Sequence, residues 1–133
     1  MTNPAVEIHF LGNGRAYLPG EMLDVEYTLV GIAAGEVRAV EVSVLWQTEG
    51  KGDEDLAVHF FQRRSVDGNA ERATRLGGAF STHLPRSPLS YAGLIVKIHW
   101  CARVRVFLSR GREVVGELPF RLGNVPPARI ATP

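Results

Sequence analysis

Histidine and cysteine are the side chains of this sequence best suited to hold a metal or to act as a nucleophile. His99 and Cys101 lie two residues apart, so on a strand they would share a face and form half of a metal site, which another strand or a partner chain would complete. His9, His59 and His83 are scattered over other segments, without the close pairs typical of zinc sites. We therefore expect a surface histidine beside a half-buried cysteine, with no metal and no cofactor.

Nucleophilic catalysis has little support in the sequence. Cys101 falls in the middle of a predicted strand, whereas a reactive cysteine needs a base and an exposed position. Ser87 and Ser90 lack the glycines of a nucleophile elbow, and no pair of carboxylates stands out for acid and base catalysis. The sequence predicts a protein that is not an enzyme, and a small enzyme using Cys101 or a histidine remains an alternative.

The segment GKGDED at residues 50–55 superficially resembles two kinds of ligand loop. It lacks the helix and the Lys-Ser/Thr pair of a phosphate-binding P-loop. Asp53, Glu54 and Asp55 offer oxygen ligands for calcium, but calcium takes about six to eight oxygens and three adjacent side chains cannot all converge on one ion. We predict a solvated loop without a metal.

A row of basic side chains is the clearest candidate for a binding surface. It lies opposite the apolar face of residues 94–108 and consists of Lys97, His99, Arg103 and Arg105. At strand spacing the row would extend over about 25 Å and could meet an acidic peptide or a series of phosphates, joined by Arg63 and Arg64 if their strand lies near. Alternatively, the face is solvated and its cations pair across strands with Glu41, Glu113 or Glu117.

The elements that would position these side chains are strands. From residue 94 to residue 108 the apolar residues fall at every second position, which is typical of a strand buried on one face. Shorter alternating segments, separated by turn signals, lie at residues 6–10, 23–29, 40–46, 56–64, 79–84 and 112–122. About seven strands and no helical apolar stripe predict an all-β, immunoglobulin-like, antiparallel two-sheet β-sandwich without a long helix, with a closed barrel as the structural alternative.

Two of these strands carry more specific expectations. In residues 56–64, Leu56, Val58 and Phe60 are assigned to one inward face, with Phe61 opposite them. Pro119 lies inside the last strand, and because proline cannot donate to the ladder, that strand should be at an edge or bulged there.

Apolar residues on the outward face would indicate an interface. If the registers are right, Phe61, Ile95, Phe107 and Val115 all point away from the core, and several such residues on neighbouring strands would form an apolar patch. An open sandwich also has unpaired edges. These edges could accept a strand from a partner or from a second copy of the chain.

Composition limits the remaining classes of protein. The chain has 133 residues, one cysteine and a formal net charge of +1, so it predicts one domain, no intrachain disulfide and no general attraction to nucleic acid. No basic leader or membrane-spanning apolar run is present, and a cytoplasmic location is expected. We place the domain at residues 1–123 and a proline-rich tail at residues 124–133.

Two segments together resemble the arrestin superfamily, a group of curved β-sandwich domains. YLPGEMLDVEYTL at residues 17–29 resembles the family's strand pair joined by an aromatic residue and a Pro-Gly turn. FSTHLPRSPLSYAGLIVKIHW at residues 80–100 resembles its strand ending in Leu-Pro, a Pro/Ser-rich corner and a long alternating strand. The resemblance implies a single arrestin-like domain of bacterial type, whose sheet edges and loops bind other proteins.

The sequence departs from that family in several respects. Arrestins pair two such domains, and this chain has length for one. We find no counterpart of the charged core that senses phosphorylation, no acidic-leucine box for clathrin and no proline-tyrosine ligase motif. Receptor regulation is therefore not implied.

The corner at residues 85–93 is expected to be structural. Pro85 and Pro88 remove two ladder donors and turn the chain. Gly93 permits a backbone angle or a close approach that a Cβ would obstruct. Tyr91 could bury its ring and bond its hydroxyl to the backbone, as in a tyrosine corner.

The sequence as a whole predicts a non-enzymatic protein-interaction or assembly module. Its partners would be proteins, in a larger complex or a homo-oligomer, bound at the sheet edges and the outer sheet face. The first alternative is a sandwich that binds an anionic lipid, a phosphate or a carbohydrate. Trp46 and Trp100 fall on inward registers, which disfavours stacking on a sugar.

Overall fold

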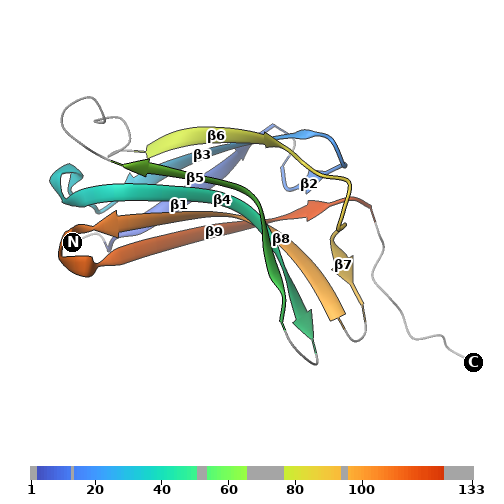
Figure 1. Cartoon of the computed structure of the whole chain (residues 1–133). Helices are drawn as coiled ribbons and strands as arrows, with labels where there is room; N and C mark the ends of the chain where they lie inside the picture. Colours follow the sequence, from blue (N-terminus) through green and yellow to red (C-terminus); the bar gives the residue numbers. More distant parts are fainter. Residues whose placement is uncertain (1–2, 13, 51–53, 66–76, 94–95, 125–133) are drawn as a thin grey trace, which may run out of the picture.

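Two sheets packed face to face form a β-sandwich in the computed structural model, which describes residues 3–12, 14–50, 54–65, 77–93 and 96–124 (Figure 1). The smaller sheet has the strand order β1-β3-β6, and the larger one has the order β2-β9-β8-β4-β5, with β7 against β8. The strands are β1 (Ala5–Leu11), β2 (Ala16–Tyr17), β3 (Met22–Val30), β4 (Val37–Gly50), β5 (Leu56–Ser65), β6 (Gly77–His83), β7 (Tyr91–Ala92), β8 (Val96–Leu108) and β9 (Glu113–Leu122). Helical structure in these residues consists of the short 3₁₀ turns Ala34–Glu36 and Ser109–Gly111. The predicted sandwich with seven main strands is confirmed.

The core lies between the sheets and follows the alternation of the long strands. On β8, every second residue from Trp100 to Leu108 is buried, as the side-chain period predicts. Before Trp100 the strand continues past the smaller sheet, so Val96 on the same face is exposed, while residues 94 and 95 lie outside the described part. Figure 1 shows β4, β5 and β8 bending away from the smaller sheet toward this end, which makes the outer face of these strands concave.

A β-bulge in β5 overturns one predicted register. Val44 of β4 pairs with Phe60, but the next residue, Leu45, pairs with Val58, so His59 is an extra residue. The bulge reverses the alternation of β5 on its N-terminal side. Phe60 packs against the core as expected, whereas Val58 and Leu56 are exposed beside Phe61 on the outer face, so the inward assignment of Leu56 and Val58 is wrong.

The corner between β6 and β8 is held by hydrogen bonds from buried groups. The Trp100 indole Nε1 donates to Pro88 O at 2.7 Å, and Ser90 exchanges two bonds of 2.8 Å with the backbone of Leu122. A Cβ on Gly93 would lie 2.5 Å from the Tyr91 ring, which confirms the predicted close approach. Tyr91 itself is 38% exposed and is no tyrosine corner. Trp100 anchors the corner instead.

The segment at residues 17–29 folds as a tight turn followed by a strand. Gly20 has φ 86° and Glu21 N donates to Leu18 O at 3.1 Å, so the Pro-Gly turn is confirmed. No feature of the sequence predicted that β2 would pair in parallel with the end of β9. Pro119 pairs only with β8, outside the stretch that β2 covers, and its predicted edge position is confirmed.

In the described ranges, no helix is long and apolar enough to cross a membrane.

Close backbone contact between β1 and β9 yields a test of the packing. A Cβ on Gly116 would lie 2.8 Å from Val6 O and 2.9 Å from Val6 Cβ. We expect Gly116→Ala to lower the free energy of unfolding by about 1–3 kcal/mol, because the strands must move apart. Gly35→Ala is the control, since nothing lies within 4 Å of the added methyl group. Equal urea midpoints for the two variants would contradict the contact.

Candidate interaction surface

The predicted basic row lies on the outer face of the larger sheet, and two of its members are paired with acids. Arg103 Nε donates to Glu117 Oε1 on β9 at 2.9 Å, and His99 Nε2 lies 2.8 Å from Glu49 Oε2 on β4. The contact of Arg103 with Glu117 matches the cross-strand pairing that the sequence left as the alternative, whereas Glu49 was not among the acids expected to pair. Lys97 is exposed and makes no ion pair with a described carboxylate.

Arg63 and Arg64, which could have joined this row, point to opposite sides of β5. Arg63 lies on the outer face, where it donates to Glu41 at 2.8 Å and covers the Phe107 ring at 5.0 Å. Arg64 turns toward the smaller sheet and donates to Tyr27 Oη at 3.1 Å and to Ala79 O at 2.7 Å. Burial raises the pKa of the Tyr27 hydroxyl, and the guanidinium of Arg64 opposes that rise.

A small hollow lies on the outer face over β4, between β5 and the part of the row that Arg103 and Arg105 form on β8. It has a volume of about 110 Å³ and is lined by Glu41, Ser43, Leu45, Val58, Phe61, Arg103 and Arg105. The buried Nε of Arg105 has no hydrogen-bond partner among the described residues. The outer face thus combines an apolar wall, from β5 and β4, with one incompletely satisfied cation.

The apolar surface of the outer face follows β5. Leu56, Val58 and Phe61 are each at least half exposed, and we call these three residues the β5 apolar strip. Leu45 and Cys101 lie beside the strip, in register with Val58, and both are buried.

The predicted patch of Phe61, Ile95, Phe107 and Val115 does not form as a unit. Phe61 and Val115 both point outward as expected, but Val115 is on β9, and two strands separate it from β5. Phe107 is half-buried beneath Arg63, and Ile95 lies outside the described residues. Alternation along the strand predicted the outward position of Phe61. The outward positions of Val58 and Leu56 are explained only by the bulge at His59.

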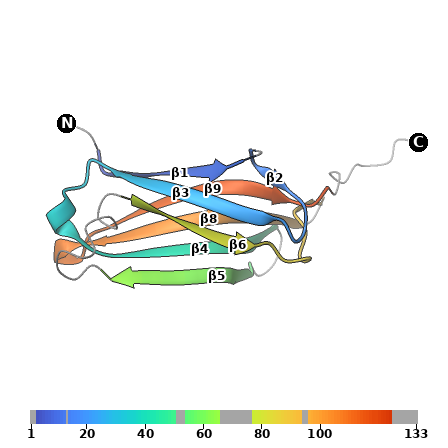
Figure 2. The same cartoon turned by 90° about the horizontal axis from the view of Figure 1, so that it is seen from above.

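The edges of the two sheets differ in how they are covered. On one side of the sandwich, β1 lies against β9 at Val6 and Gly116. On the other side, side chains of β5 cover the backbone of β6: Arg64 donates to Ala79 O, and His59 Nε2 lies 2.7 Å from His83 O. The edge of β5 has no backbone partner among the described residues, and Figure 2 shows β5 along the margin of the molecule with no strand outside it.

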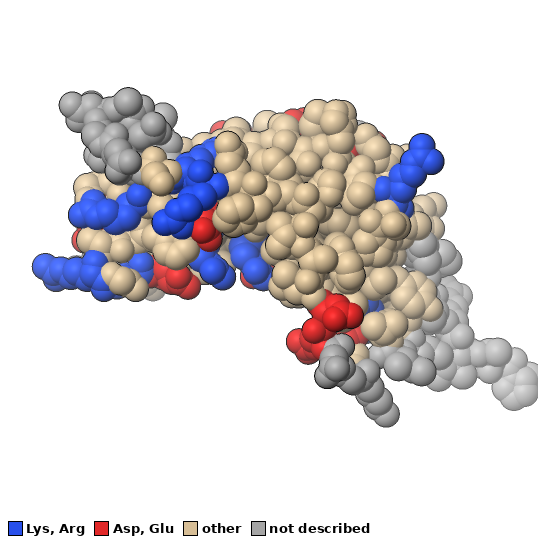
Figure 3. Space-filling model, in the orientation of Figure 1, with Lys and Arg blue, Asp and Glu red and all other residues tan. Residues whose placement is uncertain are grey.

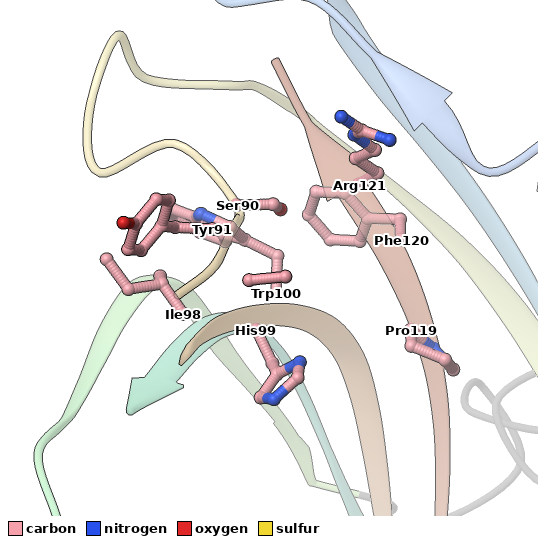
Figure 4. A pocket seen from close by; sticks show the side chains of 9 residues that line it. Ser90, Tyr91, Ile98, His99, Trp100, Pro119, Phe120 and Arg121 are labelled. Carbon is pink, nitrogen blue, oxygen red and sulfur yellow. The ribbon is translucent and has the colours of Figure 1, made fainter. Parts of the chain in front are cut away.

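A second concave site lies on β8 at the junction between the stretch that pairs with β7 and the stretch that pairs with β9 (Figure 4). Its volume is about 220 Å³, and its lining includes the rings of Tyr91, Trp100 and Phe120 together with His99 and Arg121. Ligand pockets usually measure about 300–1,000 Å³, so this one suits a single large side chain better than a cofactor.

The environment of Cys101 and the spacing of the described metal-ligand types bear on whether a reactive site exists. Burial raises the pKa of the Cys101 thiol to about 11, so little thiolate exists near neutral pH. Within the described ranges, no three His, Cys, Asp or Glu side chains gather as metal ligands. Asp53 lies outside those ranges, whereas Glu54 and Asp55 are exposed at the start of β5.

Comparison with profiles of known protein families and with curated protein sequences gave no match. Among solved structures, the chain is similar to Spo0M, a sporulation control protein from Bacillus subtilis, with a TM-score of 0.61, 11% sequence identity and 94% of this chain covered. It is also similar to a superoxide reductase (neelaredoxin) from Ignicoccus hospitalis, with a TM-score of 0.54 and 10% identity over 90% of this chain and 80% of that one. A variant of that reductase gives a TM-score of 0.51.

These similarities support the fold and nothing narrower. The chain spans about half of the Spo0M structure, 51% of its length. One structural neighbour is named for a regulatory process and the other for an enzyme, at sequence identities of 11% and 10%. The same sandwich therefore serves unrelated roles, and function has to be argued from the surface of this chain.

The buried thiol gives a direct test of whether Cys101 is a nucleophile. Since burial raises its pKa from 9.0 to about 11, we expect iodoacetamide at pH 8 to modify the folded protein at least about a hundredfold more slowly than the urea-unfolded chain. Mass spectrometry after timed quenching measures both rates. Equal rates for the folded and unfolded chain would revive the cysteine-enzyme alternative.

Proposed function

We propose that this protein is a non-enzymatic, arrestin-like interaction module that binds another polypeptide along β5 and the adjoining outer face of the larger sheet. The observation that carries the proposal is the combination of an unpaired strand edge with the β5 apolar strip on the same strand, within the part of the chain that the structure describes. An exposed apolar edge strand offers backbone hydrogen bonds and side-chain contacts to an added strand. The cytoplasmic location expected from the sequence stays part of the proposal.

The contacts of the charged residues favour a polypeptide over an anionic lipid or a row of phosphates. Arg103 and Arg63 are already paired with Glu117 and Glu41, so the basic row presents fewer uncompensated cations than its sequence suggests. Arg105 lines the hollow beside Phe61 and gives it a positive charge that one carboxylate or carbonyl oxygen of a peptide would complement. A peptide that supplies one such oxygen and apolar side chains would match this chemistry.

The carbohydrate and enzyme alternatives have less support. Trp100 is buried and donates its indole hydrogen bond to Pro88 O, so its face is not open for stacking on a sugar. The cysteine alternative needs a thiolate that the environment of Cys101 disfavours. The β5 surface needs no additional group to bind a strand.

A matched pair of variants tests the proposal. Phe61→Lys places a charge within the β5 apolar strip, while Val115→Lys places the same charge on β9; the two native side chains are 55% and 42% exposed. We expect chemical cross-linking in cells to join the wild type and Val115→Lys to a polypeptide at β5. We expect Phe61→Lys to lose most of that product, because a lysine on the edge opposes strand addition.

Urea unfolding of both variants is the control for folding. Cross-linked products that are equally abundant for Phe61→Lys and Val115→Lys, with both variants folded, would contradict a binding surface on β5. The location of the cross-link by mass spectrometry separates a product at β5 from one elsewhere on the chain.

A further inference from the structure

We infer that the strand added to β5 is the β5 of a second copy of this chain, in antiparallel orientation about a two-fold axis. This inference rests on the proposed function and names its partner. The two larger sheets would then join into one continuous sheet. The contact would be isologous, because the same strand serves both partners.

The distribution of charge along β5 supports this partner. Glu54 and Asp55 stand at the start of the strand, Arg63 and Arg64 stand at its end, and the β5 apolar strip lies between them. Figure 3 shows acidic side chains gathered at the lower tip of the molecule, basic ones at the left, and largely uncharged surface between. Reversing such a strand brings its acidic start beside a basic end, so β5 is complementary to itself.

The bulge sets which residues face each other. Directly opposed residues in an antiparallel pair point to the same face of the sheet. The outward residues of β5 are Leu56 and Val58 before the bulge at His59 and Phe61 and Arg63 after it. The symmetric alignment that matches every outward residue has its axis between His59 and Phe60.

In that alignment, Val58 lies opposite Phe61 of the second copy and Leu56 lies opposite Arg63 of the second copy. When the alternation is continued, Asp55 of each copy lies opposite Arg64 of the other copy, and Glu54 lies on the same face as Arg63 and diagonal to it. Arg63 keeps half of its side chain exposed while it contacts Glu41, so it can also meet a second carboxylate. Apolar residues thus meet at the axis, and opposite charges meet at both ends.

The state of the other strand edges explains why the contact would form at β5. Among the described residues, Arg64 and His59 bond two backbone carbonyls of β6, Ala79 O and His83 O, and β1 lies against β9. Strand β5 supplies the side chains that cover β6 and has no described strand covering its own edge. Pairing between two copies would satisfy the backbone groups of both edges at once.

The mass of the purified full chain in solution is the first test. We expect sedimentation equilibrium to give twice the 14.6 kDa of one chain at high concentration and one chain on dilution. We expect Phe61→Lys, and independently Val58→Lys, to raise the dissociation constant at least tenfold. Val115→Lys should leave it unchanged, since Val115 lies two strands away from the edge.

The alignment is tested by cysteine pairs in a Cys101→Ala background. Mixing Val58→Cys with Phe61→Cys should give a 58–61 disulfide under mild oxidation, because opposed residues lie within disulfide reach. Each variant alone should cross-link far less, since identical positions lie roughly three residues out of register. Equal yields from the mixture and from the single variants would overturn the alignment.

The outcomes separate this inference from the proposed function. A monomer at all concentrations, together with a different polypeptide cross-linked at β5, would overturn the second copy as partner and leave the interaction module standing. A monomer without any cross-link at β5 would overturn both. A dimer insensitive to Phe61→Lys and Val58→Lys would overturn pairing at β5.

Discussion

Backbone hydrogen bonding at the sheet edges is the constraint on which the rest of this structure depends. A two-sheet sandwich has strand edges on both sides, and each edge exposes N–H and C=O groups that need partners. At β6, Arg64 and His59 bond two of the backbone carbonyls, and β1 packs onto β9, where Gly116 allows the backbones to approach. These contacts direct polar side chains of β5 toward the smaller sheet. They leave the edge of β5 itself open among the described residues.

This arrangement explains why the outer face of β5 is apolar. Arg64 and His59 turn inward, and the bulge that directs His59 inward also moves Val58 and Leu56 to the outside. One local irregularity therefore both brings His59 to β6 and adds Leu56 and Val58 to the outer face beside Phe61. A single extra residue therefore connects the packing of the two sheets with the proposed binding surface, and bulges are frequent at sheet edges.

The sequence predicted the fold better than the surface, for physical reasons. Burial on one face imposes strict alternation, so the core residues of β8 were predictable. The edge position of Pro119 was predictable because proline has no N–H to donate to the ladder. The bulge could not be predicted in this way. Leu56, Val58, Phe60 and Phe61 are all apolar, so the sequence does not show which of them face the core after a shift of one residue. Ion pairs such as Arg103 with Glu117 depend on strand order, which alternation does not specify.

Concentration-dependent hydrogen exchange at the amides of β5 tests most directly whether this edge is covered by a second copy. Paired amides exchange slowly, whereas those of an open edge strand exchange quickly. The account predicts that those amides of Leu56–Ser65 that point away from β4, toward the free edge, exchange more slowly as the protein concentration rises. The exchange rates of the β9 amides should not change. Exchange at β5 that is equally fast at all concentrations would contradict the account.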